Sequence, residues 1–138
     1  MKDFHYHAHK YIGVPFRHRG RTTRGLDCVG LLILAAQDCG YDHYEEFPYG
    51  REPRNSILAG VLRRHFGNPV DREPETNDVV LMRLRKGGEP SHVGIITTHP
   101  HGLGIIHAHG AVEKVVYQRL TDHMKTGIVE VYSWQEKY

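Results

Sequence analysis

Residues 27–40 carry the strongest structural signal in this 138-residue chain, and they read Asp27-Cys28-Val29-Gly30-Leu31-Leu32-Ile33-Leu34-Ala35-Ala36-Gln37-Asp38-Cys39-Gly40. Asp27 can cap a helix, because its side-chain oxygen accepts a hydrogen bond from an unpaired backbone N–H of the first turn. Gly40 can end the helix, since glycine readily adopts the left-handed conformation that follows a last turn. The residues between them are apolar on nearly every side, so the stretch predicts one central buried helix.

The remaining sequence places helices first and strands second. Residues 1–12 predict a short helix, residues 16–25 a basic loop, and residues 41–54 an irregular segment. A second helix is predicted to begin at a cap on Asn55 or Ser56 and to end at Phe66. Alternating and apolar runs then predict strands at 78–84, 92–98, 103–108, 112–118 and 127–133. This order indicates an α+β fold whose C-terminal strands form an antiparallel meander.

The composition is typical of a soluble globular chain, with 39% hydrophobic and 25% charged residues. We expect residues 1–138 to form a single domain. The longest apolar run, from Val29 to Ala36, is too short to span a bilayer. The N-terminus lacks the apolar region of a signal peptide, which predicts synthesis in the cytoplasm without one. A net charge of +2 argues against nucleic acid or a membrane surface as a partner, whereas 12 histidines make the charge sensitive to pH.

The two cysteines occupy opposite ends of the predicted central helix. Their Cα atoms would lie roughly 16 Å apart at the rise of an α-helix, which excludes a disulfide between them. Cys28 falls in the first turn, where unpaired N–H groups and the helix dipole stabilise a thiolate. We therefore predict that Cys28 is a nucleophile with a lowered pKa. Cys39 lies at the negative end and is predicted to be a structural thiol.

A nucleophilic thiolate needs a base and a third group that orients the base. His92 opens one predicted strand and His107 lies on the next, so an antiparallel hairpin can bring the two together. The sequence thus suggests Cys28, His92 and His107 as a catalytic set. The N-terminal run of His5, His7 and His9 is predicted to lie on the surface.

Three blocks in order resemble the NlpC/P60 cysteine peptidases of bacterial cell walls. The first block runs from Gly13 to Gly20 and continues as Gly25-Leu26-Asp27-Cys28-Val29-Gly30-Leu31. The second block is Asp78-Val79-Val80 with His92-Val93-Gly94-Ile95-Ile96, and the third is Ile105-Ile106-His107-Ala108. Together the blocks extend over most of the chain, and their order makes the resemblance specific.

The resemblance implies a papain-like α+β core with Cys28 at a helix N-terminus packed against a small antiparallel sheet. Cys28 would be the nucleophile, His92 the general base and acid, and His107 the residue that orients His92. The implied reaction is hydrolysis of amide bonds in peptidoglycan stem peptides, next to a D-amino acid or diaminopimelate, through a thioacyl-enzyme. No metal or organic cofactor is expected. Phe16, Asp27 and Ser91 are the expected substrate-binding residues.

The sequence departs from the family pattern at several positions of the first block. Val29 stands where the family has serine, Phe16 where it has tyrosine, and His18 and Arg19 replace part of a Gly-Gly end. The lost tyrosine hydroxyl removes a possible substrate or oxyanion hydrogen bond. These departures keep open a second reading, in which the chain is a weakly active or inactive structural or binding module.

We expect this chain to have neither a signal peptide nor wall-binding repeats. In this respect it is similar to short phage, prophage and gene-transfer-agent tail proteins. That likeness predicts phage tail proteins as partners and a virion tail that carries the chain to the cell wall. A third reading is a metal protein that uses His99, His101, His107 and His109, since His107 and His109 share one strand face. The triad reading predicts no metal.

Overall fold

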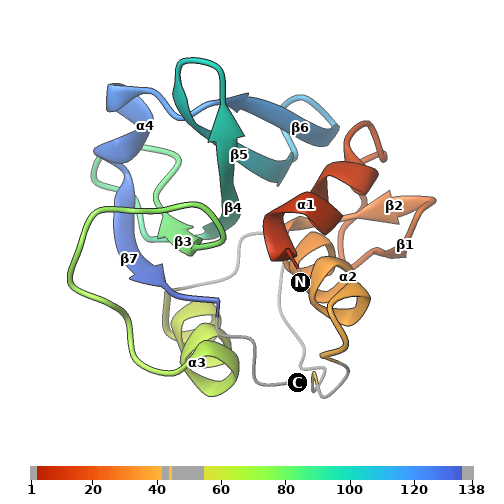
Figure 1. The fold of residues 1–138 in the computed structure, drawn as a ribbon, viewed down its shortest axis with the longest axis horizontal. Helices are drawn as coiled ribbons and strands as arrows, with labels where there is room; N and C mark the ends of the chain where they lie inside the picture. The colour runs from red at the N-terminus through yellow and green to blue at the C-terminus, as the bar shows by residue number, and fades with distance from the viewer. Residues whose placement is uncertain (1–2, 42–43, 45–54, 135–138) are drawn as a thin grey trace.

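The computed structural model describes residues 3–41, 44 and 55–134 (Figure 1). Its helical elements are α1 (Phe4–Ala8), the 3-10 turn η1 (His9–Tyr11), α2 (Cys28–Asp38), α3 (Asn55–Phe66) and α4 (Asp122–Lys125). Its strands are β1 (Arg21–Thr22), β2 (Gly25–Leu26), β3 (Val79–Met82), β4 (His92–His99), β5 (Gly102–His109), β6 (Lys114–Arg119) and β7 (Ile128–Tyr132). The irregular segment predicted for residues 41–54 falls mainly outside the described residues, as do the side chains of the predicted caps Asn55 and Ser56.

Five strands form one antiparallel sheet in the order β6-β5-β4-β3-β7. Strands β3 to β6 follow one another as a meander, which confirms the predicted arrangement for that part. β7 departs from it, because the chain turns through α4 and returns to the opposite edge, where β7 pairs with β3 (Figure 1). The backbone N–H of Arg83 donates to the carbonyl of Gly127 at 2.8 Å just before β7 begins. This contact anchors the returning chain beside β3.

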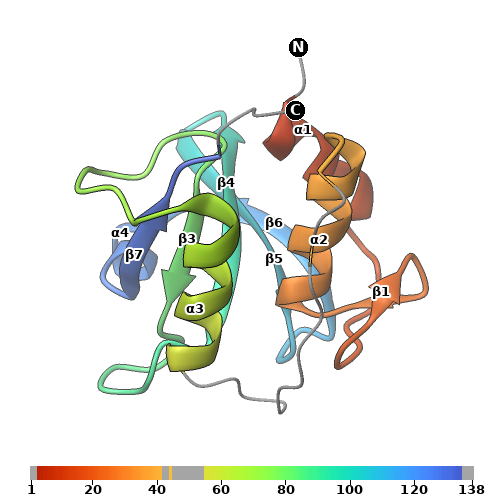
Figure 2. The same cartoon turned by 90° about the horizontal axis from the view of Figure 1, so that it is seen from below.

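The two faces of the sheet carry separate apolar clusters. Val93, Ile95 and Ile106 belong to the larger cluster, which they form with the side chains of α1, α2 and α3. Figure 2 shows α2 and α3 on this side of the strands. The opposite face holds a smaller cluster in which Ile96 and Ile105 lie with partly buried Met124 of α4. The main core therefore lies between the helices and the sheet.

Helix α2 is the central buried helix that the sequence predicts. Asp27 caps it, since its Oδ1 accepts a hydrogen bond from the N–H of Gly30 at 2.8 Å. Gly40 follows the helix with a φ of 93°, as a glycine stop requires. Gly30 is required for packing, because a Cβ there would lie 2.1 Å from the carbonyl oxygen of Gly20. The helix N-terminus is thus held closely against the preceding loop, with Cys28 as its first residue.

Three short elements differ from the sequence predictions. β1 and β2 form a small hairpin inside the predicted loop, with Arg21 paired to Leu26. Helix α4 precedes the last strand, and Thr121 caps it by accepting a hydrogen bond from the N–H of Met124 at 3.1 Å. Elements of two to four residues are too short to show a period in the sequence. Within the described residues, no helix combines the length and the apolar character that crossing a bilayer requires.

The N-terminal histidines do not form the predicted surface run. His5 Nδ1 and His9 Nε2 lie 2.6 and 2.9 Å from the hydroxyl oxygen of Thr97, which is fully buried in β4. Burial and the charge of neighbouring His5 lower the pKa of His9. These contacts attach the first helical segment to the sheet.

Candidate active site

Cys28 lies at the start of α2 with its side chain directed into the protein, and it is 8% exposed. The Asp27 side chain accepts a hydrogen bond from the N–H of Gly30, which is a later donor of the same turn. The backbone N–H groups of Val93, Val29 and Cys28 itself interact with the sulfur and favour negative charge on it. Val93 follows His92 on β4, so the strand that carries the predicted base lies directly against the predicted nucleophile.

The predicted low pKa of Cys28 is wrong for the site without substrate. Burial, followed by the negative charge of Asp27, raises the pKa of the Cys28 thiol to about 12. The three backbone N–H groups lower it, but their effect is smaller than that of burial. Position at a helix N-terminus was visible in the sequence, whereas the depth of burial was not. The sulfur is therefore a thiol until a base removes its proton.

His92 and His107 meet as the hairpin argument predicts. His92 Nε2 lies 2.7 Å from His107 Nδ1, and both side chains are buried. Burial, together with nearby His107 and His109, lowers the pKa of His92 well below its ordinary value. Burial and His109 also lower the pKa of His107, against the opposite effect of a hydrogen bond to Gln118. Both imidazoles are consequently neutral near pH 7 and can act as bases.

Gln118 is a residue of the site that the sequence reasoning missed. Its Oε1 lies 2.6 Å from His107 Nε2, and an amide oxygen can only accept a hydrogen bond. His107 Nε2 is therefore the protonated nitrogen, and His107 Nδ1 accepts from His92 Nε2. His92 Nδ1 then keeps its lone pair. The register that places Gln118 on β6 opposite Ile105, near His107, was the signal that could have identified it.

Asp27 has contacts that favour a structural role over substrate contact. Its Oδ1 accepts from the N–H of Gly30 and from Arg21 at 3.0 Å, and its Oδ2 accepts from the N–H of Arg19 at 2.8 Å. Both carboxylate oxygens are thus used to join the β1–β2 region to the helix N-terminus. Its predicted role in binding substrate stays a prediction.

Phe16 and Ser91 lie on segments next to the triad. The N–H of Phe16 donates to the carbonyl of Glu113 at 2.8 Å, and its half-buried ring faces Gly110 just after β5. Ser91 precedes His92 and is half-buried, and its N–H donates to the carbonyl of Met82 at 3.1 Å. The substrate-binding roles of Phe16 and Ser91 stay predictions.

The four histidines of the metal reading form two separate pairs. The rings of His99 and His101 are 5.8 Å apart at the β4–β5 turn, whereas those of His107 and His109 are 5.3 Å apart at the other end of β5. The prediction of a single metal site built from all four histidines is therefore wrong. In the part of the chain that the structure describes, no group of three or more His, Cys, Asp or Glu side chains is placed to hold a metal ion.

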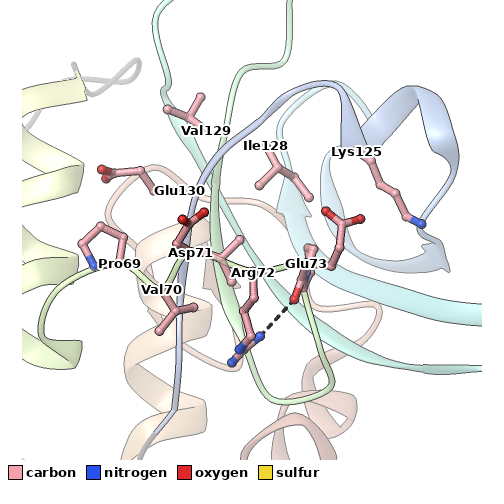
Figure 3. Close-up of a pocket in the computed structure, with 11 residues that line it drawn as sticks. Pro69, Val70, Asp71, Arg72, Glu73, Lys125, Ile128, Val129 and Glu130 are labelled. Atoms are coloured by element: carbon pink, nitrogen blue, oxygen red, sulfur yellow. Dashed lines mark hydrogen bonds between the residues drawn. The ribbon is translucent and has the colours of Figure 1, made fainter.

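Two cavities lie on the side of the sheet that carries α4. One, of about 710 Å³, includes His107 and Gln118 in its lining. The other, of about 630 Å³, lies between residues 69–74 and β7 (Figure 3). Arg72 in its wall donates to both carboxylate oxygens of Asp78 at 2.6 and 3.0 Å. The positive charge of Arg72 is therefore already neutralised by Asp78. No triad residue lines this second cavity, and it is separate from the candidate site.

Comparison with known proteins finds a curated relative of this chain. A probable endopeptidase NlpC of Escherichia coli (strain K12) is 27% identical over 127 residues, which cover 91% of this chain and 66% of that protein. The chain thus spans about two thirds of the length of this curated relative. No family model matches the chain.

Solved structures share the fold at lower sequence identity. The NlpC/P60 domain of the peptidoglycan hydrolase SagA has a TM-score of 0.64 at 21% identity, and the match covers 96% of this chain and 97% of that one. An NlpC/P60 family protein from Bacillus cereus has a TM-score of 0.65 at 18% identity, covering 96% and 39%. The peptidoglycan hydrolase RipB of Mycobacterium tuberculosis gives 0.63 at 18%, covering 94% and 61%. The chain has the NlpC/P60 fold, and the predicted α+β class is confirmed.

Proposed function

We propose that this chain is a cysteine hydrolase that cleaves amide bonds in peptidoglycan stem peptides. The observation that carries the proposal is the arrangement of Cys28 at the start of α2 against the strand that presents His92, with His107 bound to His92 at 2.7 Å. The similar proteins named as an endopeptidase and as peptidoglycan hydrolases supply the substrate class.

The first half of the reaction is acylation of the sulfur. His92 Nδ1 takes the proton of the Cys28 thiol as the sulfur attacks the amide carbonyl carbon, and a carbon–sulfur bond forms. Negative charge moves to the carbonyl oxygen, where backbone N–H groups at the start of α2 would stabilise it. The carbon–nitrogen bond then breaks, and His92 gives its proton to the leaving amine.

The second half releases the acyl group. A water molecule attacks the thioester carbon while His92 Nδ1 takes one of its protons. The carbon–sulfur bond breaks, the sulfur regains a proton from His92, and the carboxylic acid product leaves. His107 holds the His92 ring throughout, since its Nδ1 accepts the His92 Nε2 hydrogen and stabilises the transient imidazolium.

Before substrate binds, the proton that is transferred in the reaction is on the Cys28 sulfur rather than on His92. Burial raises the pKa of Cys28 and lowers that of His92, so both groups are neutral before substrate binds. Proton transfer is therefore coupled to attack on the substrate. General-base catalysis by His92 fits this state better than attack by a preformed thiolate.

Digestion of purified peptidoglycan tests the proposal. We expect the wild-type chain to release new amino groups and soluble peptides, and we expect Cys28→Ala and His92→Ala to abolish this release. Cys39→Ala is the matched control, since it removes the other buried thiol and should retain activity. Full activity in Cys28→Ala would contradict cysteine catalysis. Binding of peptidoglycan without any hydrolysis by the wild type would favour the inactive binding module.

The virion-tail setting is a separate part of this proposal. It rests on the sequence likeness to short phage tail proteins, with tail proteins as partners and the particle as the route to the cell wall. Mass spectrometry of purified particles is expected to detect the chain in tails. Its presence in host wall fractions with none in particles would contradict the tail setting and leave the proposed hydrolysis intact.

A further inference from the structure

A third imidazole, which the proposed reaction does not use, lies beside the histidine pair. The ring centroid of His109 is 5.3 Å from that of His107 and 5.9 Å from that of His92. His107 and His109 are two residues apart on β5, so their side chains lie on the same face of the sheet. Three titratable rings therefore gather around the group that acts as the base.

His109 differs from the other two rings in its access to solvent. His92 is 4% exposed and His107 is 2% exposed, whereas His109 is half-buried. It also lines the cavity of about 710 Å³ that includes His107 in its lining. Burial disfavours a charge on His92 and on His107. Of the three rings, His109 is therefore the first to accept a proton from solvent as the pH falls.

The hydrogen bond that His109 makes is compatible with this proton uptake. The N–H of exposed Ala111 donates to His109 Nδ1 at 3.1 Å, so the neutral ring carries its hydrogen on Nε2. A proton from solvent is added at Nδ1 and ends this hydrogen bond, after which water can pair with the Ala111 N–H. The hydrogen bond between His92 and His107 is not broken by this change.

The surroundings of His109 are mainly cationic. Its titratable and charged neighbours are His92 on β4, His107 on β5, Lys114 opposite it on β6, His123 in α4, and Arg83, Arg85 and Lys86 in the β3–β4 loop. Glu113 is exposed in the turn that leads to Lys114. Among the described residues that line the cavity there is no Asp or Glu. A positive charge on His109 is therefore not neutralised within the cavity and acts on the two buried rings.

A charge on His109 opposes proton uptake by His92. In the proposed reaction His92 becomes an imidazolium when it takes the proton of the Cys28 thiol. A second positive charge on a ring centred 5.9 Å away repels this imidazolium, and burial strengthens the repulsion. The same repulsion contributes to the lowered pKa values of His92 and His107. The coupling is the same whether the proton on His92 comes from solvent or from the thiol.

We propose that His109 is a positioning residue that senses pH and sets the acid limit of the reaction. Neutral His109 permits proton transfer from Cys28 to His92, and protonated His109 blocks it. His109 touches no reacting atom and acts only through the histidine pair. The inference rests on the proposed function, because it concerns the proton transfer of that reaction.

The dependence of kcat/KM on pH tests this role in chains that differ only at residue 109. On one stem peptide between about pH 5 and about pH 8, we expect the wild type to lose activity on acidification. His109→Gln should move this loss to a pH lower by about one unit, because the sensing charge is gone. His109→Lys carries the charge at every pH and should lower kcat on the order of tenfold throughout. His101→Gln, at the exposed β4–β5 turn, is the control and should leave the profile unchanged.

The two variants at residue 109 distinguish charge from packing. Opposite effects of the neutral and the charged side chain support the proposal. A lost packing contact would instead lower activity in both variants by a similar factor at every pH. That result overturns the proposal, as does a wild-type profile in both variants.

NMR titration of the imidazole groups in Cys28→Ala separates this inference from the proposed function, since it needs no turnover. We expect His92 and His107 to titrate at higher pH when His109→Gln is added, and at lower pH when His109→Lys is added. Titration of the pair that does not depend on residue 109 overturns the proposal. Coupled titration in a chain that does not hydrolyse peptidoglycan would contradict the proposed function and leave the coupling established.

Discussion

Gln118 determines which ring nitrogen carries the proton in His107 and, through it, in His92. Its amide oxygen requires a proton on His107 Nε2, and this leaves His92 Nδ1 as the base. Replacing Gln118 by leucine removes this constraint and allows the inactive tautomers. We expect Gln118→Leu to lower kcat about tenfold or more with little change in KM, as measured on a stem peptide.

Glutamate at the same position distinguishes this role from packing. A carboxylate also accepts the His107 proton, so Gln118→Glu should recover much of the activity lost in Gln118→Leu. Its charge should also raise the pKa of His107, and the acid limb of the pH–rate profile should move to higher pH. Gln37→Leu, the same change on the exposed side of α2, is the control. Equal loss in both Gln118 variants with an unshifted profile would contradict tautomer control.

Phe16 tests the substrate-binding prediction for the loop before the hairpin. Its half-buried ring lies next to Gly110, beyond the end of the strand that carries His107. An added hydroxyl either meets the charge that develops in the reaction or is buried without a partner. We expect Phe16→Tyr to keep the fold and to change kcat/KM by about a few-fold. Unchanged kinetics, with Phe16→Ala lowering only thermal stability, would show that Phe16 is a packing residue.

At the scale of elements, α2 depends on close approach to the loop before it. A methyl group at Gly30 would lie 2.1 Å from the Gly20 carbonyl oxygen, a backbone atom that cannot turn aside. We expect Gly30→Ala to lower the free energy of unfolding by about 1–3 kcal/mol in urea titrations. It should also lower activity, because the first turn carries Cys28.

Gly60 provides the matched control for that change. It lies in helix α3, and a Cβ at Gly60 meets nothing within 4 Å. Alanine there should raise stability by about 0.5–1 kcal/mol, because glycine is unfavourable inside a helix. If both alanine variants change stability by the same amount and sign, helix propensity rather than the Gly20 contact explains the Gly30 effect.

Elements with a complete local signal were predictable from the sequence. Asp27 and Gly40 delimit α2 by capping and by a glycine stop, and α3 ends before Gly67 as predicted. The pairing of β7 with β3 was not predictable, because a strand pattern indicates which face is buried but not which strand is its neighbour.

The candidate site shows the same division between local and tertiary information. Cys28, His92 and His107 stand in recognisable motifs, and the structure places them on adjoining elements. Gln118 has no motif, and its role depends on the register between β5 and β6. The pKa of Cys28 depends on burial by the whole fold, so the helix position alone gave the wrong direction.

For the whole molecule, the lowered histidine pKa values predict weaker folding in acid. Burial is the main cause for His9, His92 and His107, and their ordinary value is 6.5. The unfolded chain takes up protons below that pH while these folded residues do not. We therefore expect the free energy of unfolding to decrease as pH falls below about 6.5.

Urea titrations at about pH 7.5 and about pH 5.5 measure this dependence. The double variant His92→Gln/His107→Gln should show a smaller decrease between the two, since it removes two of the three groups. Stability that stays constant or rises on acidification would be inconsistent with neutral buried histidines.

The most direct test of the account is to identify the atom that reacts with substrate. A stem-peptide analogue that carries an electrophilic ketone in place of the scissile amide would be incubated with the chain, and the adduct located by mass spectrometry. We predict one adduct on Cys28, none on Cys39, and strongly reduced modification in His92→Ala. Equal modification of both cysteines, or hydrolysis that continues while Cys28 stays unmodified, would contradict the assignment of Cys28 as the nucleophile.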